Sequence, residues 1–196
     1  MARTRQRADA DTPSRILDSA ERLVQIRGFN GFSYADVASE LDITKASLHY
    51  HFPGKAELGE ALVERYAARF ADALSAIDKR GGKAPGKLEA YASVYAEVLR
   101  ARRMCLCGML AAGYDTLPES MRTAVIRFFD ENEGWLARVL ERGAGEGTLV
   151  FAGSASAVAQ SIISGLEGAM LIARPYGDVA RFDSVANRIL AGLVNK

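Results

Sequence analysis

Apolar residues recur three and four positions apart along nearly the whole chain of 196 residues, and no stretch shows sustained alternation of apolar and polar side chains. Spacing of three and four places side chains on one face of a helix, whereas alternation is typical of a strand. The sequence therefore predicts an all-α fold. Glycine and proline mark the breaks, and the longer helices are expected near residues 56–77, 87–102, 104–113, 118–143, 154–174 and 178–194.

The first predicted helix lies between a proline and a glycine. Thr12 is expected to cap its N-terminus, and Pro13 suits the first helical position, where a backbone N–H has no partner within the helix. Gly28 is expected to end this helix in the left-handed conformation, which glycine adopts without strain.

Two short helices are predicted next, separated by a break of three residues. Ser33 is expected to cap the first of them, with Asp36 three positions on as its partner in a capping box. Thr44 is expected to cap the second, which Pro53 and Gly54 end. Together with the first helix, these two form the pattern of a helix-turn-helix unit.

The same region resembles the DNA-binding segment of the TetR family of repressors. The resemblance rests on the ordered residues of Ser33–Ala38, Ile43–Phe52 and Gly54–Leu58. It implies an N-terminal three-helix helix-turn-helix DNA-binding domain, with a basic arm, over residues 1–56. It also implies a larger helical domain for effector binding and dimerisation over residues 57–196.

The third helix suits recognition of DNA. A helix enters a major groove about 12 Å wide, so a short helix with small residues fits where its backbone approaches the bases. No acid lies between Ile43 and Lys55, which favours contact with a polyanion. The resemblance implies that Lys45 and Ser47 reach base edges, while His49 contacts either a base or a phosphate. It further implies phosphate contacts from Ser33, Thr44, Tyr50, His51 and Lys55.

Tyr34 and the arginines of the N-terminus each have two interpretations. Tyr34 is either a core ring or a phosphate ligand, whereas Leu48 is expected in the core. Arg3, Arg5 and Arg7 form a basic arm that either lies along the DNA or is a solvated tail.

A helix-turn-helix protein reads a palindromic operator as a dimer, because its two recognition helices must lie about 34 Å apart. The predicted helix 154–174 carries many small residues, which allow close packing against another helix. The resemblance implies that this helix and the last one pair with their counterparts in a homodimer. The other interpretation is that both helices serve only the core of one chain.

The central part of the chain is rich in large, adaptable apolar side chains. Such side chains suit a pocket for a small-molecule effector, which the resemblance implies, and they suit an ordinary core equally well. The candidate pocket residues are Tyr91, Tyr95, Met104, Met109, Tyr114, Phe128, Trp135 and Met170.

Cys105 follows Arg102 and Arg103 at the start of a predicted helix, where positive charges and a helix N-terminus favour a reactive thiolate. Some TetR-family members that sense electrophiles or oxidants carry a cysteine at the start of a similar Cys-x-x-Gly stretch, which here ends at Gly108. Cys105 is therefore either a redox-active thiol or a small buried side chain.

Charge and cysteine content bound the class of protein. The net charge of +1 comes from 25 basic and 24 acidic residues, an average that can hide a local DNA-binding surface. The two cysteines are one residue apart, so no disulfide framework is expected. No secretory signal is evident, and the apolar stretch 155–173 contains Glu167, so we expect a cytoplasmic protein rather than a membrane protein.

Enzymatic activity is not expected. A nucleophilic hydrolase needs a histidine held by a carboxylate, and the only two histidines, His49 and His51, belong to the predicted recognition helix. Their spacing also suits a metal site poorly, so neither a metal nor a cofactor is expected. The predicted function is a repressor that a small-molecule or thiol-reactive effector releases from its operator. The alternative is an all-helical adaptor or ligand-binding protein that does not bind DNA.

Overall fold

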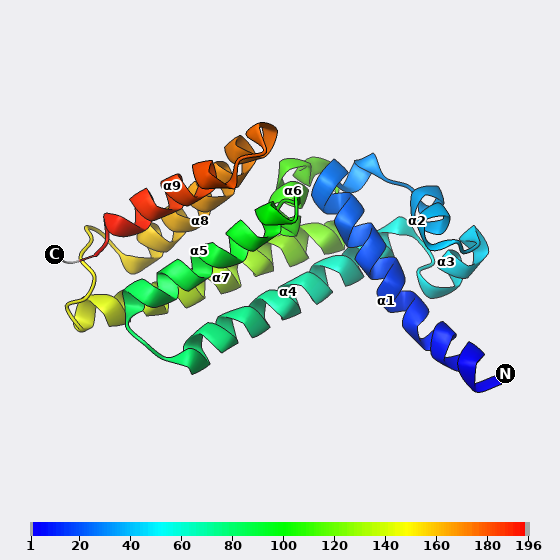
Figure 1. The fold of residues 1–196 in the computed structure, drawn as a ribbon, viewed down its shortest axis with the longest axis horizontal. Coiled ribbons are helices and arrows are strands. Elements are labelled where there is room, and N and C mark those ends of the chain that lie inside the picture. The colour runs from blue at the N-terminus through cyan, green and yellow to red at the C-terminus, as the bar shows by residue number, and fades with distance from the viewer. Residues whose placement is uncertain (1, 195–196) are drawn as a thin grey trace. The chain divides into compact units, whose positions relative to one another are not determined.

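The computed structural model of the chain describes residues 2–194, with side chains from residue 11 onward, and it is helical throughout (Figure 1). Its longer helices are α1 (Ala2–Arg27), α4 (Lys55–Arg80), α5 (Ala84–Arg100), α7 (Glu119–Gly145), α8 (Ala155–Ala173) and α9 (Val179–Ala191). The shorter ones are α2 (Tyr34–Leu41), α3 (Lys45–His51) and α6 (Leu106–Ala112), with 3-10 turns η1 (Phe29–Gly31), η2 (Tyr114–Thr116) and η3 (Arg174–Tyr176). The prediction of an all-α fold is confirmed.

The chain divides into two compact units whose boundaries differ from the predicted division at residue 56. The first unit contains the chain up to Tyr66 together with Leu106–Val125. The second contains Ala67–Cys105 and the chain from Ile126 onward. Helices α4 and α7 therefore each contribute residues to both units.

Contacts between distant segments explain why Leu106–Val125 joins the first unit. Helix α6 packs against α1, and the side chain of Met121 lies close to Gly59 of α4. A methyl group at Gly59 would collide with the sulfur of Met121 and the ring of Phe29. Such contacts between residues far apart in sequence leave no periodic signal, so the sequence alone did not predict them.

Helix α1 begins eleven residues earlier than the sequence predicts, at position 2 instead of 13. It starts at Ala2 rather than after Thr12, and Pro13 lies inside it. Proline removes one backbone N–H from the helix, but the residues before it are rich in alanine and arginine, which favour helix. The backbone of the expected basic arm is therefore helical, whereas the side chains of Arg3, Arg5 and Arg7 lie outside the described residues.

Gly28 ends α1 with a positive φ of 78°, as a terminating glycine should, but its ψ of 167° is extended rather than left-handed helical. Ile16, Leu23 and Val24 of α1 are buried, which fixes the helix on the core of the first unit. The end of this helix at Gly28 was thus correctly predicted, while its start was not.

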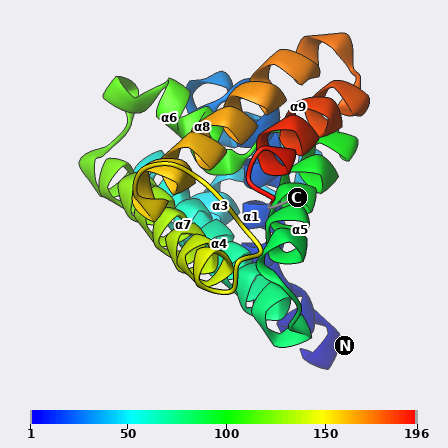
Figure 2. The ribbon, with the colours of Figure 1, turned by 90° about the vertical axis from the view of Figure 1, so that its left-hand side faces the viewer.

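The second unit is built around α5, α8 and α9. Helix α9 packs against both α8 and α5 (Figure 2). Gly165 of α8 allows this closeness, since a methyl group there would lie 2.6 Å from Cδ1 of Ile189. The segment Ala155–Tyr176 is the one stretch among the described residues that is long and apolar enough to span a membrane. Buried core helices pass the same test, and α8 buries Ile162 and Leu166 within this unit.

Candidate DNA-binding site

The break between α2 and α3 is a tight turn at Asp42. This residue has a left-handed backbone (φ 54°, ψ 47°), which aspartate tolerates better than most residues. The N–H of Ile43 donates to the carbonyl of Ala38 at 3.0 Å and so closes the end of α2. The turn lets the chain reverse within three residues, as a helix-turn-helix requires.

The predicted N-caps of α2 and α3 are both present. Ser33 and Asp36 form a capping box: the Asp36 N–H lies 3.4 Å from the Ser33 hydroxyl, and the Ser33 N–H donates to the Asp36 carboxylate at 2.7 Å. The Ser33 hydroxyl also donates to that carboxylate at 2.6 Å, and these bonds lower the pKa of Asp36. The hydrogen of the Ser33 hydroxyl is therefore already used within the chain.

Thr44 differs from Ser33 in this respect. Its hydroxyl oxygen accepts from the N–H of Ser47 at 3.1 Å, which caps α3. The hydroxyl hydrogen has no acceptor in the described part of the chain and can donate outward. Thr44 thus retains the donor that a phosphate contact needs, at the helix end where backbone N–H groups favour anions.

One side of α3 is buried and the other is open to solvent. Leu48 is fully buried, which confirms its predicted place in the core. Lys45 and His49 are exposed, Ser47 and His51 are half-buried, and the side chain of Tyr50 is 84% exposed. A short helix anchored by one leucine therefore presents the predicted base-reading residues on its surface.

The Tyr34 side chain forms hydrogen bonds with the backbone just after α3. Its hydroxyl lies 2.9 Å from the carbonyl of Phe52 and 2.6 Å from that of Gly54, and it donates to these acceptors. Burial raises the pKa of Tyr34 to about 12, and the nearby charge of Glu57 adds to the rise. Of the two interpretations of Tyr34, the structure favours the core ring, because its hydroxyl is satisfied within the domain.

His49 is exposed but held in place. Its ring lies 4.8 Å from the ring of Tyr34, centre to centre. Its Nδ1 lies 3.0 Å from the carbonyl of Pro53, which can only accept, so Nδ1 carries the proton in this contact. Its other ring nitrogen, Nε2, is the atom left for a base or a phosphate.

Lys55 is directed into its own domain rather than left free at the surface. Its ammonium donates to the carbonyl of Phe32 at 2.6 Å and lies over the rings of Phe29 and Phe32, at 4.8 Å and 4.5 Å. Burial lowers the pKa of Lys55, and the Asp36 carboxylate opposes that shift. In this arrangement Lys55 joins the start of α4 to the segment before α2, a role that its sequence position did not reveal.

Two acids of α2 are paired with arginines of α1. Arg22 forms an ion pair with Glu40, and Arg27 lies 3.5 Å from the Asp36 carboxylate. These pairs reduce the negative field on the side of α2. They explain how a chain of net charge +1 can present a surface around α3 that does not repel DNA.

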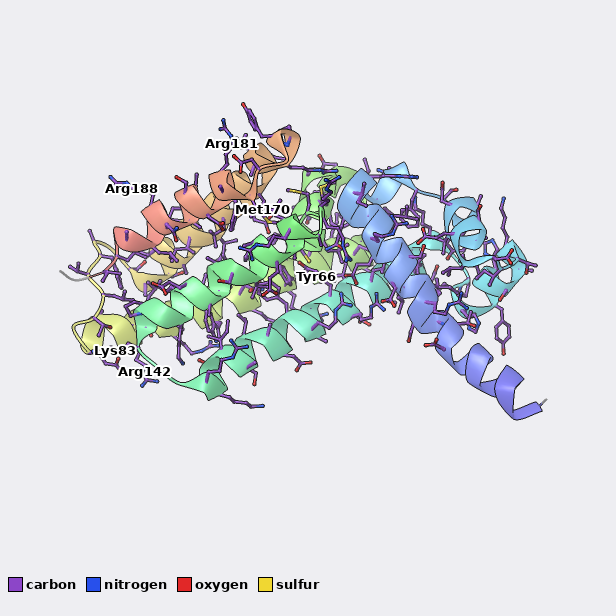
Figure 3. All side chains as sticks on the ribbon, in the orientation of Figure 1. Tyr66, Lys83, Arg142, Met170, Arg181 and Arg188 are labelled. Atoms are coloured by element: carbon purple, nitrogen blue, oxygen red, sulfur yellow. The ribbon has the colours of Figure 1, made fainter. Side chains whose placement is uncertain are left out.

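Most of the predicted effector residues gather in the second unit. Tyr91, Tyr95, Phe128 and Trp135 surround Phe70, or one another, with ring centres 5.2 to 6.0 Å apart. Met104 and Met170 are buried in the same unit, and Figure 3 labels Met170.

Met109 and Tyr114 do not belong to this aromatic cluster. Both lie in the first unit, because the chain from Leu106 to Val125 packs there. Met109 approaches Gly28, and the ring of Tyr114 lies 5.8 Å from the guanidinium of Arg122. Their place in one pocket with the other six residues stays a prediction.

The two tyrosines of the aromatic cluster and Asn132 form a small group of polar side chains. The Tyr91 hydroxyl lies 3.0 Å from that of Tyr95 and donates to Oδ1 of Asn132 at 3.4 Å. Burial raises the pKa of both tyrosines, so both stay neutral. Asn132 was not predicted as part of this cluster, because an asparagine in a predicted surface helix carries no distinguishing pattern.

Glu167 is a buried acid beside Cys105. Burial raises the pKa of Glu167 to about 7, and a hydrogen bond from the Cys105 thiol opposes the rise. Its Oε1 is buried and has no hydrogen-bond partner among the described residues. The sequence did carry a signal for Glu167, since it is the one charged residue within α8. Cys105 is itself buried, which disfavours the thiolate that the sequence suggested.

Two family profiles match the chain. The profile described as "Bacterial regulatory proteins, tetR family" matches residues 16–62, which contain α2 and α3. The profile described as "Tetracyclin repressor-like, C-terminal domain" matches residues 84–189.

Individual proteins agree with these matches. The HTH-type transcriptional repressor NemR of Escherichia coli (strain K12) is 28% identical over 84% of this chain and 84% of its own length. The transcriptional regulator AcuR of Cereibacter sphaeroides is 28% identical over 76% of this chain and 69% of its own. The crystal structure of a TetR-family transcriptional regulator from Agrobacterium tumefaciens is 32% identical, with a TM-score of 0.92 over 95% of this chain and 100% of that one.

Proposed function

The chain belongs to the TetR family of bacterial transcriptional regulators, and on that premise we propose that it is a dimeric repressor that a small-molecule effector releases from a palindromic operator. It is a DNA-binding regulator with a helix-turn-helix and not an enzyme. The repressor role, the dimer, the effector and a cytoplasmic location go beyond that family assignment. A relative that carries the name of a repressor, NemR, supports the repressor role.

The observation that carries the DNA-binding proposal is the exposed side of α3. It presents Lys45 and Tyr50 above a buried Leu48, and no acid lies between Ile43 and Lys55. Lysine there favours phosphate oxygens and guanine edges, and a free hydroxyl at Thr44 favours a phosphate.

We take the roles of the individual side chains from the family resemblance, and the bonds of Thr44 and His49 within the chain support two of them. Lys45 and Ser47 read base edges, Thr44, Tyr50 and His51 hold phosphates, and His49 approaches DNA through Nε2. The Ser33 hydroxyl donates its one hydrogen to Asp36 and has none left for a phosphate oxygen, whereas Lys55 donates to Phe32 and keeps further N–H groups that can donate to a phosphate. We therefore retain Lys55 as a phosphate contact and rank Ser33 below it.

The dimer proposal rests on the exposed side of α8. Leu171 and Ile172 are 58% and 60% exposed, and they follow Ser164 and Gly168 on the open side of the helix. A methyl group at Gly168 would meet nothing within its own chain. Large apolar side chains next to small residues are typical of a helix that packs against a second copy.

For the effector, we propose a small molecule that enters the aromatic cluster of the second unit. The unpartnered Oε1 of Glu167 supports this site, because a buried acceptor without a donor favours a ligand that supplies one. A thiol-reactive effector is the second candidate, since the Cys105 thiol already donates to Glu167, which offers an acceptor for its proton. Replacement of Cys105 by serine should abolish release from DNA by the effector in the second case and preserve it in the first.

A gel shift with the DNA upstream of the protein's own gene tests the proposed function against the adaptor alternative. The protein should shift this DNA at both about 50 mM and about 200 mM salt, and a shuffled sequence only at the lower salt. The variant Lys45→Glu serves as the control, and at the higher salt it should shift neither the upstream DNA nor the shuffled sequence. Absence of a shift by the wild-type protein at either salt would leave the adaptor as the better interpretation.

A further inference from the structure

A surface cavity of about 450 Å³ lies in the second unit, apart from the aromatic cluster. Its walls come from the residues that follow α5 and from the connection between α8 and α9. Its volume is that of a site for a small organic molecule. Nothing in the proposed DNA-binding or aromatic sites uses these residues.

Three arginines line the cavity: Arg102, Arg103 and Arg174. One acid, Asp178, lines it too, but its carboxylate is engaged elsewhere. One oxygen accepts the N–H of Ala180 at 2.9 Å to cap α9, and the other lies 4.0 Å from Arg181. The cavity therefore has an excess of positive charge.

Arg102 occupies a backbone position that favours glycine. Its φ is +57°, and the N–H groups of Arg102 and Arg103 bond to the carbonyls of Leu99 and Val98 in the arrangement that ends many helices. Glycine would adopt this conformation without strain, whereas arginine does so at a cost. A strained residue with a charged side chain on a cavity wall indicates a functional constraint.

Apolar groups complete the cavity. Leu99, Ala173, Pro175 and Val179 lie on its walls, together with Tyr176. The ring of Tyr176 lies 3.8 Å from the guanidinium carbon of Arg181, which fixes one edge of the cavity near the start of α9, where Figure 3 labels Arg181. A ligand held here would meet both guanidinium groups and hydrocarbon.

We propose that this cavity binds a small organic anion, whose carboxylate or phosphate group meets Arg102, Arg103 and Arg174 and whose apolar part lies against Leu99 and Ala173. Guanidinium groups bind both oxyanions through paired N–H donors. Binding itself does not depend on the proposed repression, and only an effect of the anion on DNA affinity rests on that proposal.

Isothermal titration calorimetry on the full chain tests the site, with benzoate and phenyl phosphate as probes and benzyl alcohol as the neutral control, at constant ionic strength. At least one anion should bind and the alcohol should not. The variant Arg102→Gly should lower the affinity for that anion about tenfold. Its melting temperature should equal or exceed that of the wild type, because glycine relieves the positive φ.

Arg188→Ala is the matched control, because this arginine of α9 does not line the cavity (Figure 3). It should leave anion affinity unchanged. Arg174→Gln provides a second variant with the same expected loss as Arg102→Gly. Equal binding of benzyl alcohol and the anions, no binding of either anion, or unchanged affinity in both cavity variants would overturn the proposal. A protein that fails to bind DNA but still binds the anion would contradict the proposed function and leave this site intact.

Discussion

The Tyr34 hydroxyl donates to the Gly54 carbonyl at 2.6 Å and so joins the first residue of α2 to the turn before α4. The same hydroxyl lies 2.9 Å from the carbonyl of Phe52, directly after α3. The chain from Tyr34 to Phe52 includes α3, the helix that we propose to enter the major groove. Its orientation therefore depends on a side chain that needs no contact with DNA.

Replacement of Tyr34 by phenylalanine should destabilise the domain by about 1–3 kcal/mol, because two partly buried carbonyls lose their donor. Operator affinity should fall as well, since the end of α3 is no longer held. Urea unfolding and fluorescence anisotropy measure the two effects. Tyr50→Phe is the control for stability, because this side chain is 84% exposed. Equal stability of the two variants would show that the Tyr34 hydroxyl does not anchor the turn.

Lys45 and Lys55 should respond differently to replacement by alanine. Lys45→Ala should leave the free energy of unfolding nearly unchanged, weaken operator binding and relax sequence preference, because this exposed lysine is proposed to read bases. Lys55→Ala should lower stability as well as affinity for any DNA, since its ammonium also bonds to Phe32. Competition with random DNA measures the sequence preference of each variant, and urea unfolding measures its stability. Loss of stability in Lys45→Ala, or none in Lys55→Ala, would reverse the assigned roles.

The features predicted correctly from sequence are those that neighbouring residues determine. The caps at Ser33 and Thr44 depend on groups three positions away, and Leu48 follows from helical spacing. The early start of α1 was missed because Pro13 resembles a helix start more strongly than a helix interior.

Contacts between distant segments account for the other differences. Met109 and Tyr114 lie in the first unit because α6 packs on α1, some 80 positions earlier in the chain. The inward direction of Lys55 depends on a carbonyl 23 residues away. The hydrogen bond of Cys105 with Glu167 likewise joins α8 to a non-helical residue 62 positions earlier in the chain.

Glu167 should make stability depend on pH. Its pKa rises from an ordinary 4.5 to about 7 on folding, so between these values the folded chain holds a proton that the unfolded chain releases. Stability should therefore fall as pH rises from about 4.5 to about 7, by up to about 3 kcal/mol. Glu167→Gln should remove this loss, so that it is more stable than the wild type at pH 8 and similar to it near pH 5. The same pH dependence in both proteins, measured by urea unfolding, would exclude Glu167 as its source.

The dimer can be tested at Gly168. A Cβ at this exposed position meets no described atom within 4 Å, so leucine should leave the stability of a single chain nearly unchanged, but it should separate two α8 helices that pack face to face. Sedimentation velocity should show a dimer for the wild type and a monomer for Gly168→Leu. Ala68→Leu, at an exposed position of α4, is the control and should stay dimeric. A dimeric Gly168→Leu would move the interface away from this side of α8.

Hydroxyl-radical footprinting on an operator selected from random DNA tests the central claim most directly, since it reports both the helix that enters the groove and the number of copies bound. A dimer that inserts two α3 helices should protect two sites about one helical turn, or a multiple of it, apart, with two-fold symmetry. Lys45→Ala should weaken both protected sites together. A single protected site without symmetry, or symmetrical protection that Lys45→Ala leaves unchanged, would contradict recognition by paired α3 helices.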